Sequence, residues 1–167
     1  MPKILGIVRH GKSTWEYGPV NDFDRPLKES GINNTIAIAQ KLLEKKYSPS
    51  LMISSPANRA LHTAMILARE MHFPAENVRI NTSLYTETED EVMDLIKLTD
   101  DIYPSLFIFG HNPTFTYLAN HFLNHKIENL PTSGVALFEF SVEHWSDISR
   151  KTVVRELCIF PKNINGN

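Results

Sequence analysis

The sequence contains a single cysteine, Cys158, among its 167 residues. One cysteine cannot form an intramolecular disulfide, so the chain has to fold without covalent cross-links, as expected of a cytoplasmic protein. Cys158 lies in an apolar segment near the end of the chain. We expect it to pack there as a small apolar side chain rather than to serve as a catalytic thiol.

Long apolar runs are absent as well. No apolar stretch approaches the ~20 residues that a membrane-spanning helix requires. The first residues also lack the charged region and the apolar core of a secretion signal. We therefore expect a protein that acts in the cytoplasm and has no membrane partner.

The chain shows no large excess of charge of either sign. Its 17 lysine and arginine residues are offset by 19 acidic residues, which gives a formal net charge of -2. A general nucleic-acid-binding domain would carry a basic excess, so no nucleic-acid partner is expected. The balance still allows a small basic pocket.

The sequence does contain the alternating pattern of a single α/β domain. Short apolar or β-branched runs predict strands at residues 3–8, 51–54, 78–80, 106–109, 135–140 and 153–160. Apolar residues at helical spacing predict helices over residues 32–46, 57–71, 87–98 and 113–124, with Ser30 as the N-cap of the first and Pro113 as the first residue of the last. This alternation predicts a three-layer α/β/α sandwich with a mostly parallel central sheet over residues 1–162, followed by a frayed tail over residues 163–167.

Polar side chains follow three of the predicted strands. Arg9-His10-Gly11 follows the first, Ser54-Ser55-Pro56 leads from the second to Arg59, and Gly110-His111-Asn112-Pro113 follows the fourth. An open α/β sheet places its chemistry outside the carboxyl ends of its strands. The sequence therefore predicts a functional site at this edge of the sheet.

These residue types suit phosphoryl transfer. The guanidinium groups of Arg9 and Arg59 can bind phosphate oxygens bidentately and stay charged at any working pH. His111 and its neighbour Asn112 are predicted to bind the same phosphate, next to a helix N-terminus that favours anions. His10 is the candidate nucleophile, because a neutral imidazole nitrogen can attack phosphorus and form a phosphohistidine.

Each of these residues has a plainer explanation when it is taken alone. A histidine at a strand end is usually a satisfied surface or core residue, and Arg59 in the first turn of a helix could be a solvated side chain. His111 could be a turn residue. All of these explanations would have to hold together to remove the predicted site.

In their order and spacing, the motifs resemble the histidine phosphatase superfamily, which includes the cofactor-dependent phosphoglycerate mutases. The resemblance rests on Arg9-His10-Gly11, on Ser54-Ser55-Pro56 with Arg59 and Thr63, and on Gly110-His111-Asn112-Pro113. Similarity to its small SixA-like branch of phosphohistidine phosphatases rests on Asp22-Phe23-Asp24-Arg25-Pro26-Leu27, Gly31 and Leu84-Tyr85. The resemblance extends from about Lys3 to about Cys158.

The resemblance implies a phosphoglycerate mutase-like fold and a phosphatase that acts through phospho-His10, with Arg9, Arg59 and His111 on the phosphoryl group. It implies no metal and no other cofactor. The preferred substrate is protein phosphohistidine, for example on a histidine phosphotransfer domain, and a small phosphate ester is the alternative. The alternative from another functional class is a non-catalytic phosphate-binding or interaction module.

Three further residues near the expected site have two explanations each. Many members of the superfamily carry an acid shortly after the leucine that Leu84 resembles, although the SixA-like branch commonly lacks it. Glu87 near this position is either a general acid or a carboxylate at a helix start. Lys12 either adds positive charge to the pocket or is a solvated loop lysine. Arg25 is expected to form a structural ion pair rather than to contact substrate.

Overall fold

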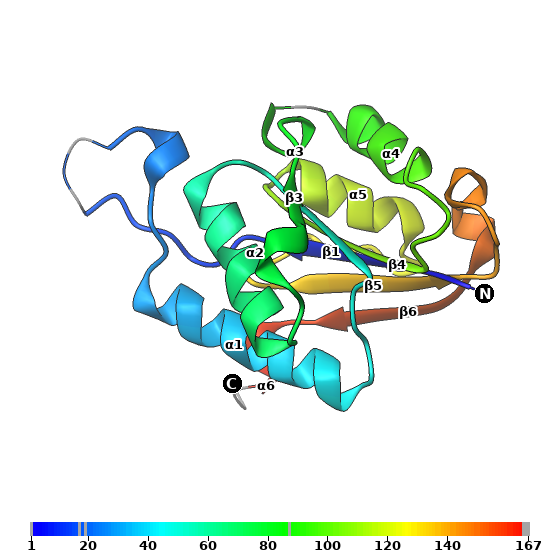
Figure 1. Ribbon diagram of the computed structural model, residues 1–167, viewed down its shortest axis with the longest axis horizontal. Helices are drawn as coiled ribbons and strands as arrows, with labels where there is room; N and C mark the ends of the chain where they lie inside the picture. The colour runs from blue at the N-terminus through cyan, green and yellow to red at the C-terminus, as the bar shows by residue number, and fades with distance from the viewer. Residues whose placement is uncertain (1, 17, 19, 87, 165–167) are drawn as a thin grey trace.

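The computed structural model of the protein describes residues 2–16, 18, 20–86 and 88–164. Its centre is a six-stranded sheet with the strand order β3-β2-β4-β1-β5-β6 (Figure 1). The strands are β1 (Lys3–Arg9), β2 (Leu51–Ser54), β3 (Val78–Ile80), β4 (Ser105–Gly110), β5 (Val135–Phe140) and β6 (Val153–Ile159). Among these strands β5 runs in the direction opposite to the other five. The mostly parallel sheet that the sequence predicts is therefore confirmed.

Helices cover both faces of this sheet (Figure 1). One face carries α1 (Glu29–Glu44), α2 (Asn58–Glu70) and the single turn α6 (Pro161–Ile164). The other face carries α3 (Ser83–Thr86), α4 (Glu89–Lys97) and α5 (Thr114–Phe122). The predicted three-layer sandwich is confirmed. No helix in the described part of the chain is long and apolar enough to span a membrane.

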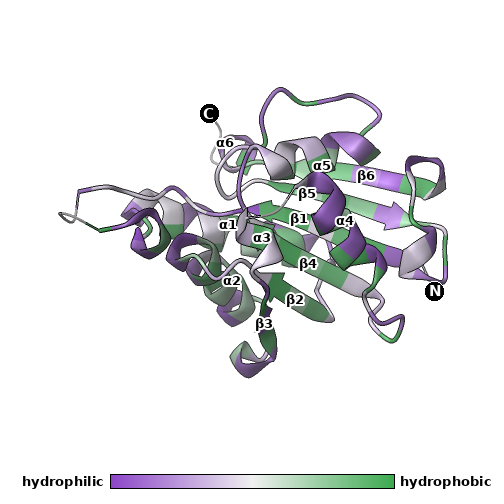
Figure 2. Ribbon diagram, turned by 90° about the horizontal axis from the view of Figure 1, so that it is seen from above, coloured by the Kyte–Doolittle hydropathy of each residue, from purple (hydrophilic) through white to green (hydrophobic). Residues whose placement is uncertain are grey.

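The strands divide their side chains between two cores. Leu106 and Ile108 of β4 pack on the side of α4 and α5, whereas Phe107 and Phe109 pack on the side of α1 and α2. Successive side chains of a strand point to opposite faces, so a strand that is covered on both faces is a nearly continuous apolar run. Figure 2 shows these hydrophobic residues along the central strands. Each fully buried Leu, Ile or Phe side chain stabilises the fold by about 1.5–3 kcal/mol.

The sheet also brings the carboxyl ends of neighbouring strands together. β1 and β4 end opposite each other at Arg9 and Gly110, and β2 ends beside them. Backbone pairing continues one residue further, because His10 N donates to Gly110 O (3.1 Å) and Ser55 N donates to Phe109 O (2.9 Å). These bonds fix the points at which the segments that follow the strands leave the sheet.

Two predicted helix starts are wrong. α1 begins at Glu29, and Lys28 rather than Ser30 occupies the N-cap position. The backbone N–H of Lys28 donates to Lys12 O (2.7 Å), so pairing with a distant loop outweighs the capping preference of serine. Pro113 is the N-cap residue of α5 rather than its first helical residue.

Other predicted ends differ because tertiary contacts interrupt the helical pattern. α5 ends at Phe122, since Leu123 adopts an extended backbone and buries its side chain. α3 is a single turn, too short to produce a periodicity, and the sequence does not predict it. α4 starts at Glu89, and Glu87 lies outside the described residues. Asn163 and Ile164 belong to α6 instead of an irregular tail.

Cys158 packs against the core on the α4–α5 side of the sheet. It lies in β6, and burial raises the pKa of its thiol. A thiol with a raised pKa carries little of the reactive thiolate. The expectation that this cysteine packs as an apolar side chain is confirmed.

Gly31→Ala tests how closely α1 is held against the loop that follows β1. A Cβ at this position would lie 2.4 Å from Lys12 O and 2.8 Å from Lys12 N, and these backbone atoms cannot move aside as a flexible side chain can. We expect the free energy of unfolding, measured by chemical denaturation, to fall by about 1–3 kcal/mol. Ser30→Ala, at an exposed position in the same turn, should change it by less than about 0.5 kcal/mol. Equal losses in the two variants would contradict this packing argument.

Candidate active site

His10 follows directly after β1, and only 8% of it is exposed. Its Nδ1 lies 2.7 Å from Gly11 O, and because a carbonyl oxygen only accepts, Nδ1 carries the proton. The lone pair of the ring therefore lies on Nε2. Burial, together with the charges of nearby arginine side chains, lowers the pKa of His10 to about 4. The ring is neutral at physiological pH and has a nitrogen available for attack.

A second imidazole, that of His111, lies beside His10, with 5.2 Å between the ring centroids. His111 Nε2 is 2.8 Å from Ser55 Oγ. The hydroxyl of Ser55, which accepts the N–H of Ala57 (3.2 Å), can donate its own proton to Nε2, and in that arrangement the ring proton of His111 lies on Nδ1. Burial, together with the neighbouring His10 and Arg59, lowers the pKa of His111 to about 3. This ring is also neutral.

Arg9, Arg25 and Arg59 lie close enough to His10 for their charges to lower its pKa. The Nε atoms of all three arginines and Nδ1 of His111 are buried, and none of these four atoms has a hydrogen-bond partner within the described ranges. Roughly 90% of buried polar groups in proteins have a partner. Three unpaired guanidinium Nε donors and one unpaired ring nitrogen therefore belong to residues around His10, and their positive charge favours an anion as the ligand of this candidate site.

Hydrogen bonds from neighbouring elements hold this cluster in place. Thr63 Oγ1 in α2 accepts the N–H of Gly11 (2.8 Å) and donates to Arg59 O (2.7 Å). Arg9 Nη1 donates to Leu130 O (3.0 Å) in the segment before β5. The backbone beside His10 and the helical turn that carries Arg59 are therefore fixed relative to each other.

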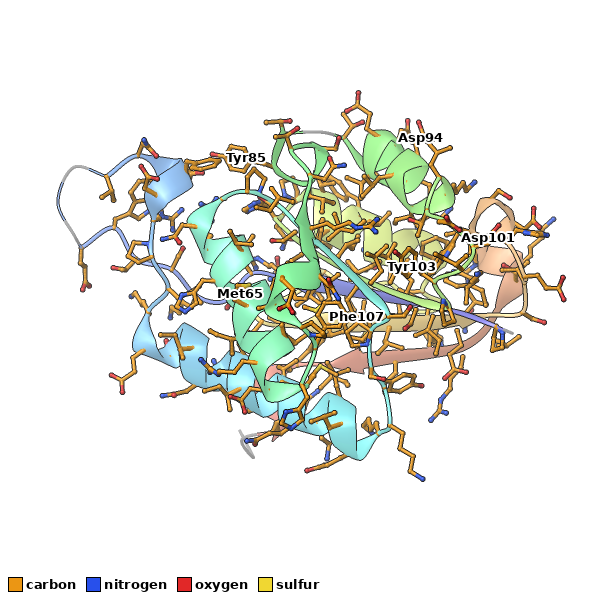
Figure 3. All side chains as sticks on the ribbon, in the orientation of Figure 1. Met65, Tyr85, Asp94, Asp101, Tyr103 and Phe107 are labelled. Atoms are coloured by element: carbon orange, nitrogen blue, oxygen red, sulfur yellow. The ribbon has the colours of Figure 1, made fainter. Side chains whose placement is uncertain are left out.

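Asp22, from the loop between β1 and α1, is bonded to two of the three guanidinium groups. Its carboxylate accepts from Arg59 Nη2 (2.9 Å) and Arg25 Nη1 (3.0 Å), and its backbone carbonyl accepts from Arg59 Nη1 (2.6 Å). Tyr85 in α3 donates its hydroxyl to the same carboxylate (2.7 Å), and its ring packs edge-on against that of His111 at 5.3 Å. Figure 3 shows Tyr85 extending from α3 toward this loop.

The ionisation of Asp22 follows from these contacts. Partial burial would raise its pKa, but hydrogen bonds from Tyr85, Arg59 and Arg25 outweigh that effect and lower the pKa to about 2. Asp22 is therefore a carboxylate throughout the physiological range, next to a site that is built for an anion.

The sequence between residues 5 and 85 matches the family described as the histidine phosphatase superfamily, branch 1. This range contains Arg9, His10 and Arg59, which the structure brings close to one another. This match supports the assignment of the chain to the histidine phosphatase superfamily.

Relatives and solved structures of similar fold agree with this assignment. An uncharacterised chloroplastic protein of Arabidopsis thaliana is 27% identical over 152 residues, which cover 86% of this chain and 69% of that protein. The fold is similar to that of the provisionally assigned phosphohistidine phosphatase SixA of Agrobacterium tumefaciens, with a TM-score of 0.77, 23% identity, and coverage of 94% of this chain and 98% of that chain. It is also similar to the protein histidine phosphatase SixA complexed with tungstate, with a TM-score of 0.79, 19% identity, and coverage of 96% and 99%. The phosphoglycerate mutase-like, SixA-like fold is therefore confirmed.

Three other residues that the sequence predicts for the site are not shown by the structure to contact a phosphate. Asn112 donates both amide hydrogens within the protein, to Asn129 Oδ1 (2.8 Å) and Leu130 O (3.0 Å), and its Oδ1 accepts from Thr116 N and Oγ1. These bonds tie α5 to the segment before β5 and leave Asn112 no side-chain amide hydrogen for a phosphate. The side chain of Lys12 is exposed, and Glu87 lies outside the described residues, so the roles suggested for both stay predictions.

Sequence reasoning missed Asp22, Tyr85 and Ser55, and it gave Arg25 only a structural ion pair. That ion pair exists, with Asp22 as the partner at 3.0 Å, and the charge of Arg25 also helps to lower the pKa of His10, so Arg25 lies near the candidate site. The available signal was the three-residue spacing of Asp22 and Arg25, which does not reveal which way loop side chains point. Within the described ranges, no group of three or more His, Cys, Asp or Glu residues is placed to hold a metal ion.

We expect two histidines of the protein, His10 and His111, to stay neutral to unusually low pH. In an NMR titration of the imidazole resonances, His10 should titrate near pH 4 and His111 near pH 3, because protonation would place a charge in a buried site beside arginines. His144 is an internal control, since its hydrogen bond with Asp101 (2.9 Å) raises its pKa above the ordinary value. A His10 signal that titrates at or above the ordinary value of about 6.5 would rule out the neutral nucleophile.

Proposed function

We propose that the protein is a phosphatase that hydrolyses phosphohistidine on a protein substrate through a phosphoryl intermediate on His10. The observation that carries this proposal is the neutral, buried imidazole of His10 beside four buried donors that have no partner in the described part of the chain. A phosphoryl group in transfer carries negative charge on its equatorial oxygens. Guanidinium N–H groups match these oxygens in both geometry and charge.

In the first step, His10 Nε2 attacks phosphorus and forms an N–P bond. The bond from phosphorus to the leaving atom breaks, and its electron pair departs with the leaving group. The hydrogen bond from Nδ1 to Gly11 O orients the ring and stabilises the positive charge that the ring acquires. The three guanidinium groups and His111 Nδ1 stabilise the charge on the transferring group without having to reorganise.

In the second step, water attacks the phosphorus of phospho-His10. A P–O bond forms, the N–P bond breaks, and the electron pair returns to Nε2, so that the neutral imidazole is restored. The attacking water gives one proton to an oxygen of the departing phosphate. The proposed mechanism uses no metal ion or other cofactor in either step.

The leaving group and the surface around the site support a protein phosphohistidine as substrate. An imidazole that is protonated on its second nitrogen leaves as a neutral ring, so it needs no general acid. Trp15 and Phe23, which are 58% and 40% exposed, lie in the loop that carries Asp22 and Arg25. Trp15 stacks on Arg25 at 4.0 Å, and Phe23 packs against Tyr85 at 5.5 Å. Exposed aromatic side chains favour contact with a protein, such as a histidine phosphotransfer domain in the cytoplasm.

His10→Ala should abolish turnover and the covalent intermediate. Rapid quenching of the wild type with a labelled phosphohistidine protein should trap an adduct that is stable in base and labile in acid, and His10→Ala should form none. The assay should give the same rate with and without EDTA. His125→Ala, which changes an exposed histidine, should keep full activity.

Turnover that survives in His10→Ala would refute the mechanism. Hydrolysis of an aryl phosphate without hydrolysis of the phosphohistidine protein would point to a small phosphate ester as the substrate. Phosphate binding without any turnover of either substrate would point to a non-catalytic module.

Arg59→Ala should reduce kcat more than it changes KM, because the charge on the phosphoryl oxygens is best matched in the transition state. The expected loss is about 2.7–4 kcal/mol of transition-state stabilisation, as for the removal of one oxyanion donor. Arg59→Lys should restore little of this, since an ammonium group cannot bond both Asp22 and a phosphate as the guanidinium fork does. A fully active lysine variant would show that the fork is not required.

A further inference from the structure

Asp22 places a negative charge at the rim of the anion site. Its side chain is 43% exposed, whereas that of Arg59, to which it is bonded, is 7% exposed. The carboxylate therefore lies on the solvent side of the guanidinium group, and the buried Nε of Arg59 lies on the inner side. Tyr85, whose ring packs edge-on against that of His111, donates a hydrogen bond to this carboxylate.

The leaving group of an in-line transfer has to pass this carboxylate. The attacking and leaving atoms lie on opposite sides of the transferring phosphorus. Because His10 is buried, the leaving atom of a phosphoryl group bound to the inner donors lies toward solvent. That is the side on which Asp22 and Tyr85 form the rim.

The net positive charge of the side chains around the site equals the negative charge of one phosphoryl group. Arg9, Arg25 and Arg59 supply three positive charges, and Asp22 offsets one of them. The remaining two match the charge of a phosphoryl dianion. A second anionic group on the substrate would meet the Asp22 carboxylate, and a cationic group would be attracted by it.

Asp22 also has room for a further hydrogen bond. A carboxylate offers about four acceptor positions. Oδ2 uses two of them for Arg59 and Tyr85, and Oδ1 uses one for Arg25. Among the contacts of the described residues, Oδ1 keeps one acceptor position, and the side chain is exposed enough for a ligand to reach it.

We propose that Asp22 selects substrates by the charge of the leaving group, accepting an N–H from the protonated imidazole of phosphohistidine and repelling leaving groups that carry a carboxylate or a second phosphate. This inference rests on the proposed function. It makes Asp22 a specificity-determining residue in addition to a partner of Arg59.

The bonds, electrons and protons of the transfer step balance when Asp22 accepts this hydrogen bond. The substrate imidazolium carries a proton on the nitrogen that is not phosphorylated, and that N–H donates to Asp22 Oδ1. When His10 Nε2 forms its bond to phosphorus, the substrate N–P bond breaks and its electron pair neutralises the imidazolium ring. The proton stays on the substrate ring, and Asp22 remains a carboxylate.

The experiment compares two small ligands of similar size by calorimetry, so it does not depend on turnover. Aminomethylphosphonate carries an ammonium group next to the phosphonate, and phosphonoacetate carries a carboxylate. The wild type should bind aminomethylphosphonate about fivefold more tightly, which is the upper range for one exposed ion pair. Asp22→Asn should remove or reverse this preference.

Two control variants separate charge from architecture. Asp24→Asn makes the same charge change at an exposed position of the same turn and should keep the wild-type preference. Tyr85→Phe removes one hydrogen bond to Asp22 but keeps the carboxylate, so it should keep the preference as well. Equal affinities of the wild type for the two ligands, or a preference that persists in Asp22→Asn, would overturn the inference.

Turnover distinguishes the two proposals from each other. For Asp22→Asn, kcat/KM should fall more for a phosphohistidine peptide than for an aryl phosphate. An equal fall for both substrates would show that Asp22 only positions Arg59 and would overturn the inference. A wild type that hydrolyses neither substrate but keeps the ligand preference would refute the proposed function and leave the charge selection by Asp22 supported.

Discussion

The burial of His10 and His111 among positively charged side chains governs the ionisation of both imidazoles. Three guanidinium groups lie close to His10, and burial removes the water that would stabilise a further charge. Both imidazoles are consequently neutral, and the bond from His10 Nδ1 to Gly11 O leaves the lone pair on Nε2. In the proposed mechanism, the same cations also attract the phosphoryl group that His10 attacks.

A cluster of like charges with unpaired donors is unfavourable by itself, so the surrounding fold has to hold it in place. The sheet does this through backbone pairing with β4 that continues beyond the ends of β1 and β2. Thr63 links α2 to the turn beside His10. Asp22 offsets one of the positive charges while it holds Arg59 and Arg25. The anion site is thus assembled from rigid elements on one side and a single loop on the other.

The extent to which the fold follows from the sequence differs between the sheet and the loops. β2, β3 and β5 have the predicted bounds. The buried side chains of β2 and β5 leave a clear apolar pattern with turn residues at the ends. The start of α1 does not follow from local preference. A hydrogen bond between Lys28 and Lys12 sets it, and a single-sequence pattern contains no information about such a pairing.

The sequence alone determined the alternation of strands and helices and placed Arg9, His10, Arg59 and His111 at or just beyond strand ends. Parallel strands align their carboxyl ends, so those residues come together whatever the loops do. Only the tertiary structure decided that Arg25 joins them, that Asn112 bonds within the protein, and that Asp22 and Tyr85 form the rim. Asp22 is 37 residues from Arg59 and 63 from Tyr85. Contacts over such separations depend on how a loop folds back on the sheet, and the packing of the whole domain determines that path.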